Sequence, residues 1–331
     1  MNITEQNYNN FFSGLSTGLL RELGSGYKTR GITNTKNNGI LKNGILISRE
    51  MESFAPAIYL DEYYEDFCSG KCLNDIIRQV LYTYRGGSEP GKRQSFHEID
   101  FSPLAMRDKI ILRIVNYARN ASGLQDIPYI RIRDLAIIFH FIVYQEAEGI
   151  GTIKLTKEHF IDYADSSAGK TPIFSTLGEL FHLALENTKR LFPVRLSQLD
   201  DVLQTLLTKQ SAPSIPFHTN TMGNAKTGDN LFVFTNTSGT NGASCILYPD
   251  IIPQLTHYFG TDFYILPSSI HELLLLPSST SFCQEELNDM IREINLSQVP
   301  EDEVLSDQSY YSRDFAQLLK LPDSVMSTTY Q

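Results

Sequence analysis

The densest run of structural signals in this chain lies between residues 241 and 277, NGASCILYPDIIPQLTHYFGTDFYILPSSIHELLLLP. The pattern predicts a strand, a helix and two further strands, at 244–248, 251–259, 263–266 and 270–276. Asp250 precedes the helix as a candidate cap, and Gly260 follows it as a candidate stop. Strands joined by so few residues usually pair with each other, which predicts a small, mainly antiparallel sheet with a helix packed on it.

The N-terminal half predicts another sheet and more helices. Apolar residues recur at helical spacing over 4–23, and Asn38-Gly39 is typical of a type I′ hairpin turn, whose two central residues need positive φ. Ser102 and Pro103 precede an apolar stripe that predicts a helix as far as Ala118. Three more strands are predicted at 129–133, 135–144 and 151–155.

These elements predict an α+β protein of two lobes, each a small, mainly antiparallel sheet covered by helices. The lobes are predicted to be an N-terminal domain, 1–168, and a C-terminal domain with an acidic tail, 169–331. The segment 209–230 between predicted elements has no periodicity, and it is interpreted either as a lid or as a disordered loop.

Charge and hydrophobicity limit the partners of the chain. The formal net charge of −10 repels phosphate at long range, so nucleic acid is not expected as a partner. No apolar run reaches the about 18 residues that a membrane helix needs. The N-terminal MNITEQNYNNFF lacks the pattern of a signal peptide, so we expect a cytoplasmic protein without a membrane partner.

Six basic residues nevertheless fall close together in the sequence: Arg107, Lys109, Arg113, Arg119, Arg131 and Arg133. They are open to two interpretations, a local basic groove or the ordinary solvated faces of a helix and a strand. The second interpretation is favoured, because solvated charges are common on both kinds of element.

The sequence predicts neither a metal nor a cofactor. Cys68 and Cys72 are separated by Gly70, which is expected to end a helix, and the next histidine is His97, so structural thiols are the favoured interpretation. Residues 168–171, AGKT, resemble part of a phosphate-binding loop. They lack its first glycine, because Ala164 stands there, and they lack the preceding buried strand, so no nucleotide is expected.

Four polar residues in YILPSSIHE form the candidate catalytic site: Ser268, Ser269, His271 and Glu272. A serine hydrolase needs a nucleophile on a sharp turn and a base directed at it, and this chain has no G-x-S-x-G motif. The favoured interpretation is that the serines satisfy backbone groups of the turn and that His271 lies at a sheet margin. If the chain is an enzyme, His257 and the 209–230 segment with His218 are expected to converge on this site.

Segments along nearly the whole chain resemble a known family. They include KNNGILKNGILI (36–47), APAIYLDEYYEDFCSGKCLNDII (55–77), DIPYIRIRDLAIIFHFIV (126–143), YILPSSIHELLLLP (264–277) and EVLSDQSYY (303–311). In these segments the chain resembles the bacterial family known as domain of unknown function 5688, whose members occur in anaerobic gut bacteria. The resemblance supplies no catalytic residues that can be transferred to this sequence.

Two functional hypotheses follow. The first is a non-enzymatic protein-binding or regulatory protein with a protein partner, because no catalytic or metal motif withstands inspection. The second is an enzyme of unrecognised type, a hydrolase for example, with a cleft near Ser268, Ser269 and His271. A deep pocket with His271 directed into it favours the enzyme, whereas an exposed apolar patch or open sheet edge favours the binding protein.

Overall fold

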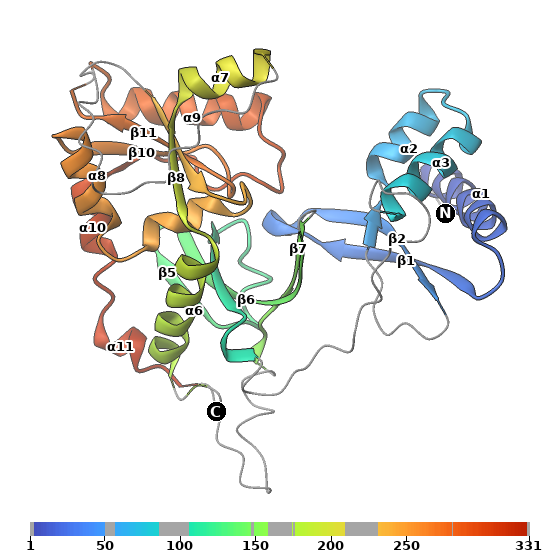
Figure 1. Cartoon of the computed structure of the whole chain (residues 1–331), viewed down its shortest axis with the longest axis horizontal. Coiled ribbons are helices and arrows are strands. Elements are labelled where there is room, and N and C mark those ends of the chain that lie inside the picture. The colour runs from blue at the N-terminus through green and yellow to red at the C-terminus, as the bar shows by residue number, and fades with distance from the viewer. Residues whose placement is uncertain are drawn as a thin grey trace, which may run out of the picture. The chain divides into compact units, whose positions relative to one another are not determined.

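The computed structural model describes residues 3–49, 57–85, 106–146, 149–157, 174, 176–208, 231–279 and 281–329. The chain forms two compact units (Figure 1). The first comprises Met1–Lys36 and Ile40–Asp100, and the second comprises Asn37–Gly39 and Phe101–Gln331. The turn Asn37–Gly39 belongs with the second unit because the Asn38 side-chain amide donates hydrogen bonds to the carbonyls of Glu301 and Val304, both at 2.7 Å.

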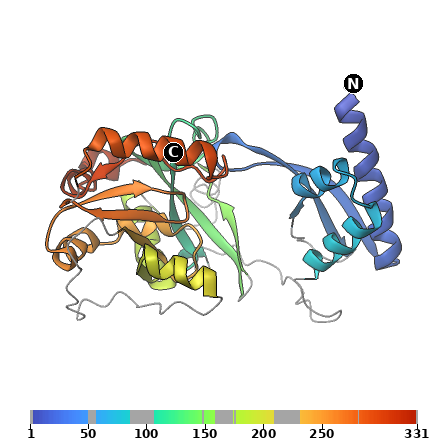
Figure 2. The same ribbon diagram turned by 90° about the horizontal axis from the view of Figure 1, so that it is seen from above.

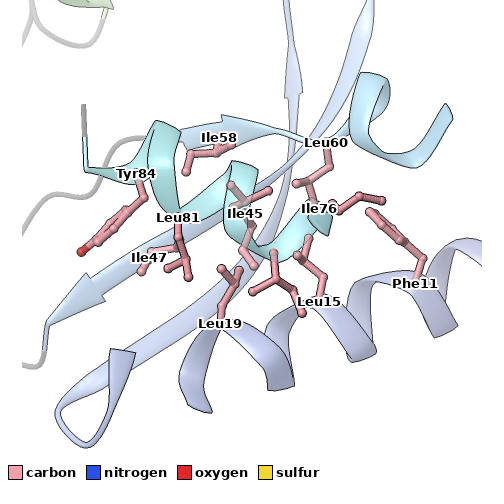
Figure 3. Close-up of a cluster of buried hydrophobic side chains, with 12 residues drawn as sticks. Phe11, Leu15, Leu19, Ile45, Ile47, Ile58, Leu60, Ile76, Leu81 and Tyr84 are labelled. Atoms are coloured by element: carbon pink, nitrogen blue, oxygen red, sulfur yellow. The ribbon is translucent and has the colours of Figure 1, made fainter. Parts of the chain in front are cut away.

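The first unit is a three-stranded sheet covered by helices. Its elements are α1 (Ile3–Leu23), β1 (Tyr27–Thr35), β2 (Leu41–Arg49), β3 (Ala57–Tyr59), α2 (Asp61–Cys68) and α3 (Leu73–Tyr84). The strands pair antiparallel in the order β1-β2-β3. Figure 3 shows Phe11, Leu15 and Leu19 of α1 directed toward Ile45 of β2 and Ile76 of α3, and all five are buried. The predicted first helix and the Asn38-Gly39 hairpin are therefore confirmed.

The second unit contains two sheets. The first has four strands: β4 (Ile110–Asn116), β5 (Tyr129–Ile132), β6 (Leu135–Glu146) and β7 (Gly149–Lys154). β6 pairs antiparallel with β4 along one edge, and with β5 and then β7 along the other. The prediction of a helix reaching Ala118 was wrong, because the run IILRIVN is buried on both faces of a strand. Apolar residues on both faces of a strand also fit a helical stripe, so periodicity could not separate the two.

The second sheet has the antiparallel order β12-β10-β11-β9-β8. Its strands are β8 (Val194–Gln198), β9 (Phe232–Asn236), β10 (Phe263–Pro267), β11 (Leu273–Pro277) and β12 (Tyr310–Tyr311). Leu266 and Leu276 pack on Leu287 and Ile291 of α9 (Gln284–Ser297), which lies along this sheet in Figure 2. On the other face, Phe232 and Phe263 contact Phe259, with ring centroids 4.9 and 5.4 Å from it.

Within residues 241–277 the predicted helix is present, but Asp250 makes no side-chain cap hydrogen bond to it, and one predicted strand is replaced by another element. Helix α8 (Ile251–Phe259) has the predicted bounds, and Gly260 ends it with φ 71°. The strand predicted at 244–248 is instead a 3-10 helix, η2 (Gly242–Leu247), whose residues are all buried. The Ser244 hydroxyl accepts a hydrogen bond from the Ile114 amide at 3.1 Å, so η2 covers the free edge of β4.

Among its described residues the second unit also has α6 (Leu177–Leu191), α7 (Leu199–Thr208), α10 (Ser312–Leu318) and α11 (Asp323–Met326). Helix α6 is joined to β4: Thr188 Oγ1 accepts from the Leu112 amide at 3.0 Å, and the Asn187 side-chain amide donates to the Ile110 carbonyl at 3.0 Å. Elements from both sides of residue 168 therefore share one unit. The compact units divide near residue 100, which differs from the expected division of 1–168 and 169–331. Position 168 itself lies outside the described residues.

The fold is of the α+β class, as predicted from the sequence. In the described parts of the chain all strand pairings are antiparallel, and the strands form three small sheets, two of them in the second unit. Within the described residues, no helix is long and apolar enough to cross a membrane.

Candidate functional site

The predicted residues Ser268, Ser269, His271 and Glu272 lie in the turn between β10 and β11. The Asn241 amide donates a hydrogen bond to Nδ1 of His271 at 3.1 Å. The other ring nitrogen, Nε2, lies 3.5 Å from Oε1 of Glu303. The His271 carbonyl accepts from the Thr235 hydroxyl at 2.8 Å. His271 is therefore connected to three other segments of the second unit.

Ser269 is used by the backbone of the same turn. Its buried hydroxyl accepts from the His271 amide at 3.0 Å, and its own amide donates to the Glu272 carbonyl at 3.1 Å. Among the hydrogen bonds of the described residues, none joins a serine hydroxyl to the imidazole of His271. This is the geometry of a turn closed by its own serine, and the hydroxyl is not placed for activation by the histidine.

The loop after β9 depends on His271 for its shape. Asn241 has φ 53°, a conformation that few residues other than glycine adopt, and its amide is held by the imidazole. A Cβ at the next residue, Gly242, would lie 2.6 Å from the His271 carbonyl oxygen and 2.7 Å from the Asn236 nitrogen. Only glycine fits there without displacing backbone, so the 236–242 loop and the β10–β11 turn are packed directly together.

The other residues considered for this site are not brought to it by the described part of the chain. His257 is exposed on α8. The 209–230 segment with His218, and the AGKT segment at 168–171, lie outside the described residues. Within the described residues there is no group of three or more His, Cys, Asp or Glu side chains placed to hold a metal ion.

A second cluster of polar side chains lies on the sheet of β4, β6 and β7. In the strand register, His140 is opposite Ile111 of β4 and Lys154 of β7. Residues directly opposite each other share a face, and so do residues two apart along a strand. Arg113, two residues after Ile111, therefore shares that face with His140 and Lys154. We call these three residues the basic cluster.

Arg113 is the least satisfied member of the basic cluster. Its Nε is buried and has no hydrogen-bond partner among the described residues, while the residue as a whole keeps intermediate exposure. The side chain lines a narrow cavity of about 10 Å³, close to the space that one water molecule needs. The other polar residues that line it are Thr188, Asn236, Thr240 and Asn241.

The pKa values of the basic cluster are shifted because its members are buried and no acidic side chain among the described residues pairs with them. Burial lowers the pKa of Arg113 to about 10. The pKa of His140 is held well below its usual value, first by burial and then by the positive charges of Arg113 and Lys154. Burial and the charge of Arg113 also lower the pKa of Lys154. Each cation in the cluster makes the charged state of its neighbours less favourable, and an anion would reverse this effect.

The basic cluster is not evident from the sequence pattern. The favoured interpretation of Arg113 as part of a solvated face is wrong, because its Nε is buried. His140 and Lys154 were not connected with it. In a strand over 110–116, side chains alternate between the two faces, which places Arg113 among buried side chains. Its pairing with His140 and Lys154 depends on the register between strands.

Both clusters fall inside a region that matches a protein family. The model of a family of unknown function, DUF5688, matches residues 8–313. The chain belongs to this family. The DUF5688 match begins in α1 and ends in α10, so it includes Arg113, His140, Lys154 and His271. No curated protein and no solved structure matches the chain. DUF5688 membership thus establishes relatedness, and roles for individual residues come from the geometry alone.

Proposed function

We propose that this chain is a non-enzymatic binding protein that holds a small oxyanion at the basic cluster. The observation that supports the proposal is the buried Nε of Arg113, which lacks a partner among the described residues. Leaving a buried donor unpaired costs about 1–3 kcal/mol, and more when the group is charged. A bound oxyanion supplies both the acceptor and the opposite charge, so the same side chain that destabilises the anion-free protein would bind the ligand.

The donor chemistry favours an oxyanion. Arginine and lysine donate hydrogen bonds and accept none, and the guanidinium fork matches carboxylate, phosphate and sulfate oxygens. The sequence alone favoured a protein partner for a binding protein. We now propose a small ligand instead, because a folded protein surface has poor access to a buried Nε. We also propose a bacterial, cytoplasmic setting, as expected from the sequence.

Isothermal titration calorimetry of the full chain with sodium sulfate tests this function. Sulfate is a suitable probe because it keeps its two charges across the pH range near neutrality in which the titrations are made. The variant Arg113→Gln removes the charge and the Nε donor, and it should weaken sulfate binding about 10- to 100-fold, the loss expected for a hydrogen bond to a charged group.

Arg131→Gln is the matched control, because Arg131 is exposed on β5 of the same sheet. Its sulfate affinity should stay within about twofold of the unchanged protein, since surface charges contribute little. Equal affinities of Arg113→Gln and the unchanged protein, or no sulfate binding by the unchanged protein, would overturn the proposal.

A further inference from the structure

His140 occupies the centre of the basic cluster. The charged groups that act on its imidazole come from both neighbouring strands: Arg113 from β4 and Lys154 from β7. The adjacent positions on its own strand, Ile138 and Ile142, share its face and are apolar and buried. The only titratable side chain between the two cations is therefore this imidazole, among the residues that the structure describes.

The contact that His140 makes tolerates either protonation state. Its Nδ1 lies 3.2 Å from Oγ1 of Thr152 on β7. A threonine hydroxyl both donates and accepts, so it can donate to a bare Nδ1 or accept from a protonated one. Protonation of the ring consequently leaves this hydrogen bond intact, and the opposition to protonation comes from burial and from the two cations.

We propose that binding of an oxyanion at the basic cluster is coupled to uptake of a proton by His140. This inference rests on the proposed function and specifies how pH regulates the same site. The imidazole lies between two cations in the basic cluster, and a bound dianion offsets the positive charge that opposes its protonation. By linkage, an anion that favours the protonated ring must itself bind more tightly as the pH falls.

The direction with pH follows from the His140 shift. Without a bound anion the pKa of His140 lies below the ordinary value of about 6.5, so the ring is neutral near pH 7. The bound anion raises this pKa, and proton uptake occurs between the two values. Within that window the dissociation constant for sulfate falls by up to about tenfold for each pH unit of acidification.

Calorimetry of the full chain in buffers with different ionisation enthalpies measures the proton uptake directly. Titrations with sodium sulfate between about pH 5.5 and pH 7.5 should show uptake of up to about one proton per bound sulfate, rising as the pH falls. His140→Gln, which keeps a hydrogen-bonding side chain toward Thr152, should abolish both the uptake and the pH dependence. His257→Gln should keep both, because His257 is exposed on α8.

The experiments distinguish the absence of proton coupling from the absence of anion binding. If sulfate binding depends on Arg113 but releases or takes up no proton, the coupling is overturned, while the proposed binding site is not. Uptake that persists in His140→Gln would have the same result, since another group would be the acceptor. The measurement on the unchanged protein requires no variant, so it decides the question even if His140→Gln does not fold. Absence of any sulfate binding would overturn both proposals.

Discussion

The backbone amide of Asn241 donates a hydrogen bond to Nδ1 of His271, at 3.1 Å. The imidazole is therefore an acceptor toward the 236–242 loop, and its other nitrogen faces Glu303. A general base must keep a lone pair for the proton it abstracts, and Nδ1 of His271 is already in use. Asn241 also lines the small cavity next to Arg113, so His271 supports the wall of that cavity.

Replacing His271 should destabilise the second unit. His271→Ala removes the acceptor for the Asn241 amide, and we expect the free energy of unfolding to fall by about 1–2 kcal/mol, the cost of an unsatisfied backbone donor. Urea unfolding followed by circular dichroism measures the change. His257→Ala is the control, because His257 is exposed, and it should change stability by less than about 0.5 kcal/mol. Equal stability of the two variants would contradict the structural role of His271.

Gly242 should tolerate no side chain. Gly242→Ala places a Cβ against the Thr235 hydroxyl and 2.6 Å from the His271 carbonyl oxygen, and we expect a loss of about 1–3 kcal/mol, typical of overpacking. Gly123→Ala is matched to it, because the nearest atom to its Cβ would be the Asn120 carbonyl oxygen at 3.7 Å. If thermal melts show equal midpoints for the two variants, the loop and the turn are not packed as described.

Cys245 should be far less reactive than the other cysteines. It is buried in η2, and burial raises the pKa of its thiol to about 12, whereas Cys68, Cys72 and Cys283 are exposed. Because the thiolate is the reactive form, N-ethylmaleimide should modify the three exposed cysteines of the native protein and reach Cys245 only in denaturant. Peptide mass spectrometry before and after denaturation distinguishes the four sites. Rapid native modification of Cys245 would contradict its burial.

Local chemistry made parts of the fold predictable from sequence. The Asn38-Gly39 turn was predictable because few residue pairs accept positive φ twice in succession, and the structure has φ values of 59° and 75° there. Helix α8 was predictable because Gly260 can end it in the left-handed conformation. The strands β5, β6 and β7 were predictable from their β-branched and aromatic composition.

Long-range relationships were not predictable in the same way. The run IILRIVN fits a helical stripe as well as a strand buried on both faces, and only its pairing with β6 decides between them. Likewise, the position of Arg113 diagonal to His140 is a property of register, which no local pattern around either residue specifies. The Ser268–His271 turn was found from sequence because its residues are adjacent. Its bond to Asn241 joins residues 30 positions apart in the chain.

Replacing Arg113 should stabilise the protein when no anion is present. Arg113→Met removes an unpaired buried donor and keeps an unbranched side chain, so we expect the free energy of unfolding to rise by about 1–3 kcal/mol in sulfate- and phosphate-free buffer. Adding sulfate should raise the midpoint of thermal unfolding for the unchanged protein and leave that of Arg113→Met unchanged. A destabilised Arg113→Met protein would indicate that Arg113 has a structural partner, which would contradict a ligand-binding role for its Nε.

The NMR signal of the Arg113 Nε–Hε group tests the central claim most directly, because it observes the atom on which the anion site depends. A spectrum of ¹⁵N-labelled full-length protein, with Arg113→Lys to assign the signal, can be followed during titration with sodium sulfate. We predict a saturable shift of the Arg113 signal, while the signal of exposed Arg131 stays in place. An Arg113 signal that does not move at any sulfate concentration would contradict the proposal that the basic cluster binds an oxyanion.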